Sequence, residues 1–408
     1  MKVHLAVVIC PRYEGGGILA DMPAEENWFT YFPENYRWSS AVCFMVSCAR
    51  WGASEIGEVD RVGRRLAQEP GDDEAWFREW VRMGDHIRKL GMAAESDGSH
   101  LTAAAHHLRA CVYYQMGERF RTPKDRRGHT VFRKSLDCFE RFAGLADKPR
   151  IERVEVPYEN GASLPAWLVH AENTRRRKPP VVVFFDGLDN TKELVYVRGV
   201  ESLVARGMSC LVVDGPGSGE AARFRNLYLR YDYEIAGSAA LDYLETRGDV
   251  NAKQAAIIAL SAGGYYAPRA ASMDHRYKAC VAWGAIWDYH ATWEKRLAAW
   301  GTSLHAVPDH HILWIMDAKT AEEALEKLEG FRLDGVVQKM RCPFLLVHGA
   351  EDKQIPMRDA RKLFNAAGSK DKTFKVFTAK EGGAQHCQRD NMTLGTTYIY
   401  DWLQRKLV

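Results

Sequence analysis

The stretch AAIIALSAGGYYAPRAA, residues 255–271, decides the fold that the sequence predicts. Its apolar run, 255–260, is typical of a buried strand, and a helix of small residues is predicted to follow directly. A serine at such a strand–turn–helix junction sits in a strained backbone and projects its hydroxyl above the sheet, as in a nucleophile elbow. The residues two before and two after Ser261 are Ala259 and Gly263, so the pattern is A-x-S-x-G in place of G-x-S-x-G.

The chain around this stretch alternates apolar strands with helical segments from residue 149 onward. Segments predicted to contain strands are 153–158, 164–171, 180–187, 208–220, 255–260, 277–286, 342–356 and 372–378. Helices are predicted at 195–207, 233–246, 357–368 and 391–407. Such alternation favours a mostly parallel, doubly wound sheet covered on both faces, with the functional groups at the carboxyl ends of the strands.

The region before residue 149 has a different character. Apolar residues at helical spacing predict helices at 73–96, 100–120 and 129–146. The polar segment DKPRIE then suggests a boundary. We therefore expect an N-terminal tail and helical lid-like domain over residues 1–148, and a catalytic domain over 149–408 with a cap insertion at about 287–335. The first ten residues, MKVHLAVVIC, lack the long core of a secretory signal and are predicted to form a strand-like or loose tail.

The composition excludes several classes of protein. The 408 residues carry a net charge of +3 spread along the chain, which indicates neither a nucleic-acid groove nor a polybasic membrane patch. No apolar run approaches the length of a membrane span. The nine cysteines include no C-x-x-C pair, so neither a disulfide scaffold nor a zinc site is indicated. We expect buried, reduced thiols in a cytoplasmic protein without metal or cofactor.

The acid and base of a catalytic triad are expected after the serine, in that order. Asp352 follows a predicted strand in LLVHGAEDKQIP and is the favoured acid. Glu351 is the neighbouring alternative, and Asp359, inside the following predicted helix, is less favoured. A loop carboxylate without any catalytic role is the competing interpretation.

The favoured base is His386, in the glycine-bearing loop KEGGAQHCQRD, because no other histidine lies beyond residue 348. A flexible loop can place its imidazole over the serine hydroxyl while Asp352 fixes the tautomer. His348 is the rival, although it precedes the acid. The histidines at 305, 310 and 311 lack a carboxylate at a suitable spacing, so no metal site is predicted there.

An oxyanion hole needs two backbone N–H groups aimed at the developing negative charge. One is predicted to be that of Ala262, directly after the nucleophile. The other is expected in the loop after the strand at 180–185, where Leu188 is favoured. The glycine-rich segment DGPGSGE, 214–220, lacks the Lys-Ser/Thr ending of a phosphate-binding loop. We therefore expect it to form a tight turn that lines the site.

These motifs, together with DGPGSGE and GGAQHC, make residues 150–408 resemble the α/β-hydrolases. The stretches GLDNTKE and LRACVYYQMGERF narrow the resemblance to the 2,6-dihydroxypseudooxynicotine hydrolase group, which includes the fungal yellowish-green-type polyketide-shortening hydrolases. The resemblance covers roughly residues 73–408. The departure is Ala259, where many relatives have glycine.

The resemblance implies hydrolysis of a C–C bond beside a ketone in an aromatic or polyketide diketone, as in polyketide chain shortening for pigment or secondary-metabolite biosynthesis. It also implies a substrate-site carboxylate at Glu193 and a homodimer. The competing interpretation of Glu193 is a carboxylate favoured by a helix N-terminus. A carboxylesterase acting on esters or lactones would need the same triad, and a non-enzymatic hydrolase-fold binding protein is the third alternative.

Aromatic side chains gather where hydrolases insert caps. Trp287 and Tyr289, with Tyr113 from the helical region, are predicted to line a pocket for a flat small-molecule substrate. Ordinary packing between cap and sheet is an equally good explanation for any one of them.

Overall fold

The computed structural model of the protein describes residues 29–122, 124–299, 307–308 and 310–408. The predicted tail at 1–10 and the histidine at 305 lie outside the described residues.

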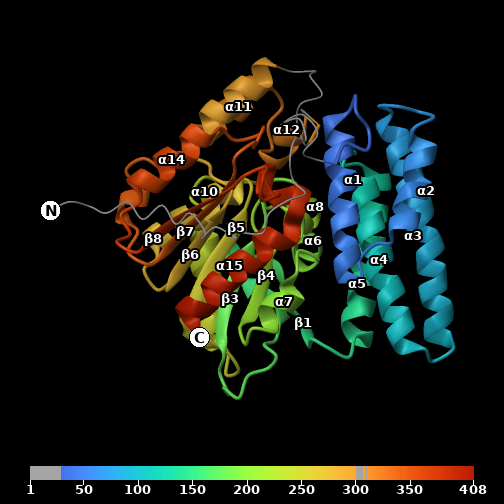
Figure 1. The fold of residues 1–408 in the computed structure, drawn as a ribbon, viewed down its shortest axis with the longest axis horizontal. Helices are drawn as coiled ribbons and strands as arrows, with labels where there is room; N and C mark the ends of the chain where they lie inside the picture. The colour runs from blue at the N-terminus through green and yellow to red at the C-terminus, as the bar shows by residue number, and fades with distance from the viewer. Residues whose placement is uncertain (1–28, 123, 300–306, 309) are drawn as a thin grey trace, which may run out of the picture.

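The helices that precede the sheet stand side by side on one flank of it (Figure 1). They are α1 (Tyr36–Cys48), α2 (Ile56–Leu66), α3 (Asp73–Ser96), α4 (His100–Glu118) and α5 (Arg126–Leu145). The last three coincide closely with the helices predicted at 73–96, 100–120 and 129–146.

Side-chain caps and small residues explain this helical region. Asp72 accepts a hydrogen bond from the Glu74 N–H, and Asp125 accepts one from Gly128, so α3 and α5 begin at these capping residues. A Cβ atom added to Gly84 would lie 2.8 Å from the ring of Tyr114. The glycine therefore allows α3 and α4 to pack closely.

The sheet contains eight strands in the order β1-β2-β4-β3-β5-β6-β7-β8. The β1–β2 and β2–β4 pairs are antiparallel, and all the other pairs are parallel. The strands are β1 (Ile151–Pro157), β2 (Ser163–Val169), β3 (Pro180–Phe185), β4 (Ser209–Val213), β5 (Asn251–Leu260), β6 (Ala279–Trp283), β7 (Phe344–Gly349) and β8 (Lys372–Phe377). This architecture is the predicted α/β-hydrolase fold with a helical N-terminal region.

Helices connect the strands and cover the sheet. Those outside the cap segment are α6 (Lys192–Tyr196), α7 (Val200–Val204), α8 (Gly219–Arg225), α9 (Glu234–Thr246), α10 (Gly263–Met273), α14 (Met357–Ala366) and α15 (Met392–Leu407). The single helix expected at 195–207 is wrong, because the chain breaks between α6 and α7 at Gly199, where φ is 84°. A Cβ atom there would lie 2.7 Å from the ring of Trp51, so the helical region also requires this glycine.

The apolar residues of β5 show why its sequence is continuously hydrophobic. Ala256, Ile258 and Leu260 belong to the core cluster shared with the helical region, and the alternate residues of the strand belong to the cluster on the opposite face. Both faces of the sheet are therefore buried, as a parallel sheet covered on two sides requires.

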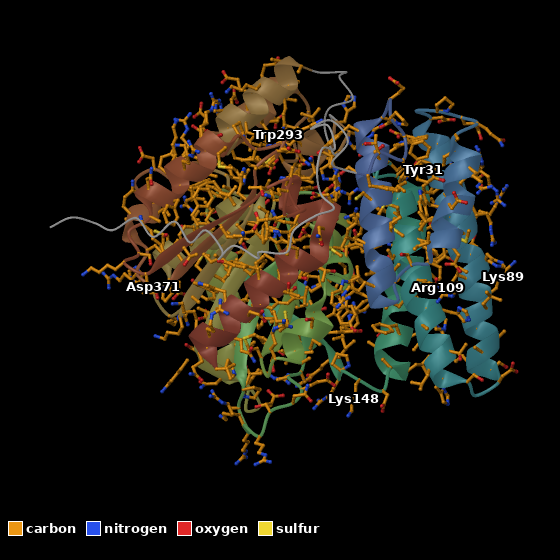
Figure 2. The ribbon with its side chains drawn as sticks, viewed as in Figure 1. Tyr31, Lys89, Arg109, Lys148, Trp293 and Asp371 are labelled. Carbon is orange, nitrogen blue, oxygen red and sulfur yellow. The ribbon has the colours of Figure 1, made fainter. Side chains whose placement is uncertain are left out.

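Between β6 and β7 the described chain forms α11 (Tyr289–Ala298), α12 (His311–Ile315) and α13 (Ala321–Leu328). Helix α11 crosses above the sheet, and Trp293 on it marks this end of the molecule (Figures 1 and 2). Lys148 lies at the opposite end, where the chain passes from α5 into the sheet (Figure 2). The domain boundary after residue 148 and the extent of the cap at 287–335 stay predictions.

None of the helices in the described part of the chain combines the length and apolar character needed to cross a membrane.

Candidate active site

Ser261 occupies the turn between β5 and α10. Its φ is 60°, in the left-handed region that non-glycine residues adopt rarely, and its N–H donates to the carbonyl oxygen of Trp283 at 2.8 Å. A Cβ atom on Gly263 would lie 2.4 Å from the Cβ of Ala259. The alanine in the motif is therefore tolerated because the residue facing it, Gly263, has no side chain.

Three side chains from distant parts of the sequence meet at this turn. The Nε2 atom of His386 lies 2.8 Å from the Oγ of Ser261, and its Nδ1 lies 2.7 Å from a carboxylate oxygen of Asp352. The other oxygen of Asp352 accepts from the N–H groups of Gln354 and Ile355 at 2.8 and 3.0 Å. The structure thus forms one hydrogen-bonded chain from carboxylate to hydroxyl.

The histidine and the carboxylate change each other's ionisation. Burial alone would lower the pKa of His386, but the adjacent Asp352 carboxylate outweighs it and raises that pKa above its usual value. Burial likewise tends to raise the pKa of Asp352, but His386 and the bonds to the carboxylate hold it below its usual value. Because the carboxylate can only accept, Nδ1 carries a proton and Nε2 faces the serine.

The structure does not bring the rival residues to Ser261. His348 is buried on β7 and donates through Nε2 to the carbonyl oxygen of Ile355 at 3.1 Å. Glu351 accepts from the side-chain amide of Gln385 at 3.3 Å. Asp359 lies in α14, within the first turn of that helix.

The two predicted oxyanion donors border the serine. A Cβ atom on Gly187 would lie 2.8 Å from the Cβ of Ser261, so the loop after β3 passes directly beside the nucleophile position. Leu188 and Ala262 both line the cavity next to Ser261. In the described part of the chain, no hydrogen bond uses the N–H of either residue as a donor.

A side chain that the sequence did not single out for this role holds the same loop. His311, in α12, contacts the carbonyl oxygen of Leu188 through Nε2 at 3.1 Å. Burial lowers the pKa of His311 to about 4, so the ring is neutral near pH 7 and donates its Nε2 proton. The only sequence signal was its place in the histidine group at 305, 310 and 311.

Among the described residues, the side chains close enough together to hold a metal ion are Glu152, His170 and Asp249. Arg247 already pairs with both carboxylates, at 2.8 and 2.7 Å. The guanidinium of Arg247 therefore already balances the two carboxylates. The cluster includes none of the residues around Ser261.

The cavity beside Ser261 has a volume of about 20 Å³, close to the space of a single water molecule. Its lining consists of Leu188, Asp189, Ser261, Ala262, Ile286, Tyr289, Arg296, Val307, Gln354 and Ile355. Of the three aromatic residues predicted to line a pocket, the structure brings only Tyr289 there. Trp287 is half-buried against the core, and Tyr113 donates its hydroxyl to Glu58 at 2.5 Å within the helical region.

Glu193 does not line this cavity, and its predicted place in the substrate site stays a prediction. Its carboxylate is fully buried and accepts from Trp167 at 2.9 Å and Gln115 at 3.1 Å. Lys192 lies 2.9 Å from the same carboxylate. Both carboxylate oxygens of Glu193 therefore have partners inside the fold. Among the described residues that line the cavity, the acid is Asp189.

The sequence is similar to fungal hydrolases. The hydrolase acrC of Aspergillus aculeatus is 26% identical over 93% of this chain and 98% of its own length. The 20-hydroxy-prefusarin hydrolase FUS2 of Gibberella moniliformis is 27% identical over 86% of this chain and 91% of its own length. The chain therefore matches these fungal hydrolases over nearly their whole length.

Solved structures show the same fold. The 2,6-dihydroxy-pseudo-oxynicotine hydrolase superimposes with a TM-score of 0.73 and 22% identity, over 89% of this chain and 96% of that one. AbyA5 gives a TM-score of 0.64 and 20% identity, over 86% and 94% of the two chains. Residues 196–408, more than half of the sequence, match the prolyl oligopeptidase family, peptidase family S9. The chain therefore belongs to the prolyl oligopeptidase family and is a hydrolase with the α/β-hydrolase fold.

Proposed function

We propose that this hydrolase cleaves a C–C bond next to a carbonyl group in an aromatic or polyketide diketone, through an acyl-enzyme intermediate. Ser261 is the nucleophile, His386 the general base and Asp352 the orienting acid. The observation that carries the proposal is the hydrogen-bonded chain from Asp352 through His386 to Ser261. Beside it lie the N–H groups of Leu188 and Ala262, which donate no hydrogen bond to any described residue.

In the first half of the reaction, Ser261 attacks one carbonyl carbon while His386 takes the hydroxyl proton. The N–H groups of Leu188 and Ala262 bind the oxyanion of the tetrahedral intermediate. When the intermediate collapses, the leaving group departs as a carbanion, which the second carbonyl stabilises as an enolate. His386 then returns the proton to carbon.

In the second half, water attacks the acyl-enzyme with His386 as general base, and the acid product leaves. An ester would pass through the same steps with an alkoxide as the leaving group, so the triad alone does not separate the two reactions. Support for a small organic substrate comes from FUS2, which is named for hydrolysis of 20-hydroxy-prefusarin.

The nucleophile is tested by labelling with a fluorophosphonate, which phosphonylates activated serines. We expect labelling of the wild-type protein at Ser261, a complete loss in Ser261→Ala and a large loss in His386→Ala. Ser96→Ala removes an exposed serine at the end of α3 and is the matched control. Absence of labelling in the wild type would favour a binding protein over an enzyme.

The bond that is cleaved is tested with benzoylacetone, a simple aromatic 1,3-diketone, alongside 4-nitrophenyl acetate. Hydrolysis of the diketone by one water gives either acetophenone and acetate or benzoate and acetone, and chromatography separates these products. We expect Ser261-dependent turnover of the diketone. Turnover of the ester alone would replace the C–C proposal with a carboxylesterase.

A further inference from the structure

Among the described side chains that line the cavity beside Ser261, one is a carboxylate, that of Asp189. This residue follows Leu188, whose N–H is a proposed oxyanion donor. When the carbonyl oxygen of a substrate binds that N–H, the substrate atoms next to the carbonyl group therefore lie close to Asp189. Because the cavity is as small as about 20 Å³, a group that enters it also meets the other lining side chains.

Asp189 is held in place from the helical region. Arg119, directly after α4, pairs through Nη2 with a carboxylate oxygen of Asp189. Its Nη1 donates to the side-chain oxygen of Asn190 at 2.9 Å and to the main-chain oxygen of Asp189 at 3.4 Å. Only 4% of the Arg119 side chain is exposed, so this is a buried, pre-organised pair.

The surroundings also keep the carboxylate ionised. Burial by itself would raise the pKa of Asp189, but Arg119 outweighs it, and Arg389 and Arg198 act in the same direction. The net effect lowers that pKa below its usual value. An ionised carboxylate accepts hydrogen bonds and donates none. The second oxygen of Asp189 takes part in none of the hydrogen bonds found among the described residues.

The remaining polar side chains of the cavity are of other kinds. Arg296, from α11, donates to the carbonyl oxygen of Gln354 at 3.4 Å. It is the one cationic side chain among the described residues that line the cavity. Tyr289, also from α11, presents a phenol whose pKa burial raises to about 12, so it stays neutral. The cavity lining therefore carries a negative charge at Asp189 and a positive charge at Arg296.

We infer that Asp189, positioned by Arg119, is a substrate-binding residue that selects molecules carrying a hydroxyl group, phenolic or aliphatic, close to the carbonyl that Ser261 attacks. The inference rests on the proposed function for the reaction itself, and it names the substrate class. A site built to accept a hydroxyl proton disfavours analogues that lack it, because the buried carboxylate then loses water without gaining a partner.

Three esters with acyl chains of matched length test the selection: 4-nitrophenyl butyrate, its 3-hydroxybutyrate counterpart and the monoester of succinic acid. We expect the wild type to prefer the hydroxy ester over the butyrate by about tenfold or more in kcat/KM. Asp189→Asn should lose at least tenfold more activity on the hydroxy ester than on the butyrate. Arg119→Lys, which retains a cation, should preserve the preference better than Arg119→Met.

Other patterns among these esters would overturn the inference. Equal losses on all three esters in Asp189→Asn would mean that the residue only supports the loop. A wild-type preference for the succinate ester would assign selectivity to Arg296.

Binding to Ser261→Ala separates this inference from the proposed reaction, because it needs no turnover. Calorimetric titration should show that resorcinol binds at least tenfold more tightly than 1,3-dimethoxybenzene, which has no hydroxyl protons. The additional Asp189→Asn substitution should abolish that difference. Equal or undetectable binding of both probes would overturn the inference, whereas loss of fluorophosphonate labelling in the wild type would overturn the reaction.

Discussion

At the scale of single residues, the ionisation of His386 decides when Ser261 is activated in the proposed mechanism. General-base catalysis requires an unprotonated Nε2, and the Asp352 carboxylate raises the pKa of the ring. We therefore expect kcat/KM for 4-nitrophenyl butyrate to rise with pH through a value above the usual 6.5 of histidine. Asp352→Asn should move this limb to lower pH and reduce kcat by about 10³–10⁴, because the tautomer is no longer fixed.

A pH–rate profile from about pH 5 to 10 measures both effects. The control is Glu351→Gln, which alters the neighbouring carboxylate without touching His386 and should leave the limb where it is. An unchanged limb in Asp352→Asn would show that another group sets the protonation of the base.

The carboxylates also show where residue-level prediction reaches its limit. Asp352 followed from its place after a strand and before His386, and the structure brings it to that histidine. The place of Asp189 in the cavity lining was not predicted: the sequence pointed only to Glu193, four residues later in GLDNTKE. Thr191 caps α6, so the chain turns there, and Glu193 enters the buried group around Lys192. A turn of the backbone decides which acid faces the cavity.

At the scale of elements, two helices that are remote in sequence hold the loop after β3 through side-chain hydrogen bonds. Gln115 in α4 accepts the hydroxyl proton of Thr191 at 2.6 Å, and His311 in α12 donates to Leu188. The strand that leads into the elbow could be predicted from its apolar run, and the helix that follows it from its small residues. The hydrogen bonds of Gln115 and His311 to this loop could not be predicted. Hydrophobic periodicity shows which face of a helix is buried, but it does not show which residue a polar side chain will contact.

The hydrogen bond from α12 is tested by a matched pair of variants. His311→Leu removes the donor to Leu188 and should lower kcat for 4-nitrophenyl butyrate by roughly tenfold to 100-fold, with little change in KM, since misplacing an oxyanion donor weakens transition-state binding. His311→Gln keeps an N–H near the position of Nε2 and should recover most of the rate. Equal rates in both variants would show that His311 only fills space.

At the scale of the whole molecule, the helical region and the sheet share one core and are joined by buried charges. The class of sheet and the helices α3 to α5 could be predicted from hydrophobic periodicity. Their mutual packing could not, because it depends on ion pairs between residues more than a hundred positions apart. Glu118 of α4 accepts from Arg223 of α8 at 3.0 and 2.7 Å and lies 3.1 Å from the Nζ of Lys124.

This junction predicts how the two regions depend on each other. Burial tends to raise the pKa of Glu118, but Arg223 and Lys124 outweigh it and lower that pKa below the usual 4.5. Its contribution to stability is therefore present above pH 4.5 and is lost as the pH falls through the lowered value. Glu118→Gln leaves two buried cations uncompensated and should reduce the free energy of unfolding by about 3–5 kcal/mol at neutral pH.

Urea unfolding followed by tryptophan fluorescence at neutral and acidic pH measures this loss. Glu140→Gln is the control: its side chain is 60% exposed and lies 3.4 Å from Arg153, so its loss should cost no more than about 1 kcal/mol. The difference between Glu118→Gln and wild type should shrink in acid, where Glu118 becomes protonated in both the folded and the unfolded wild type. If the difference in free energy of unfolding did not change with pH, Glu118 would stabilise the fold through the packing of its side chain. Its ionised carboxylate would then not be what joins the helical region to the hydrolase core.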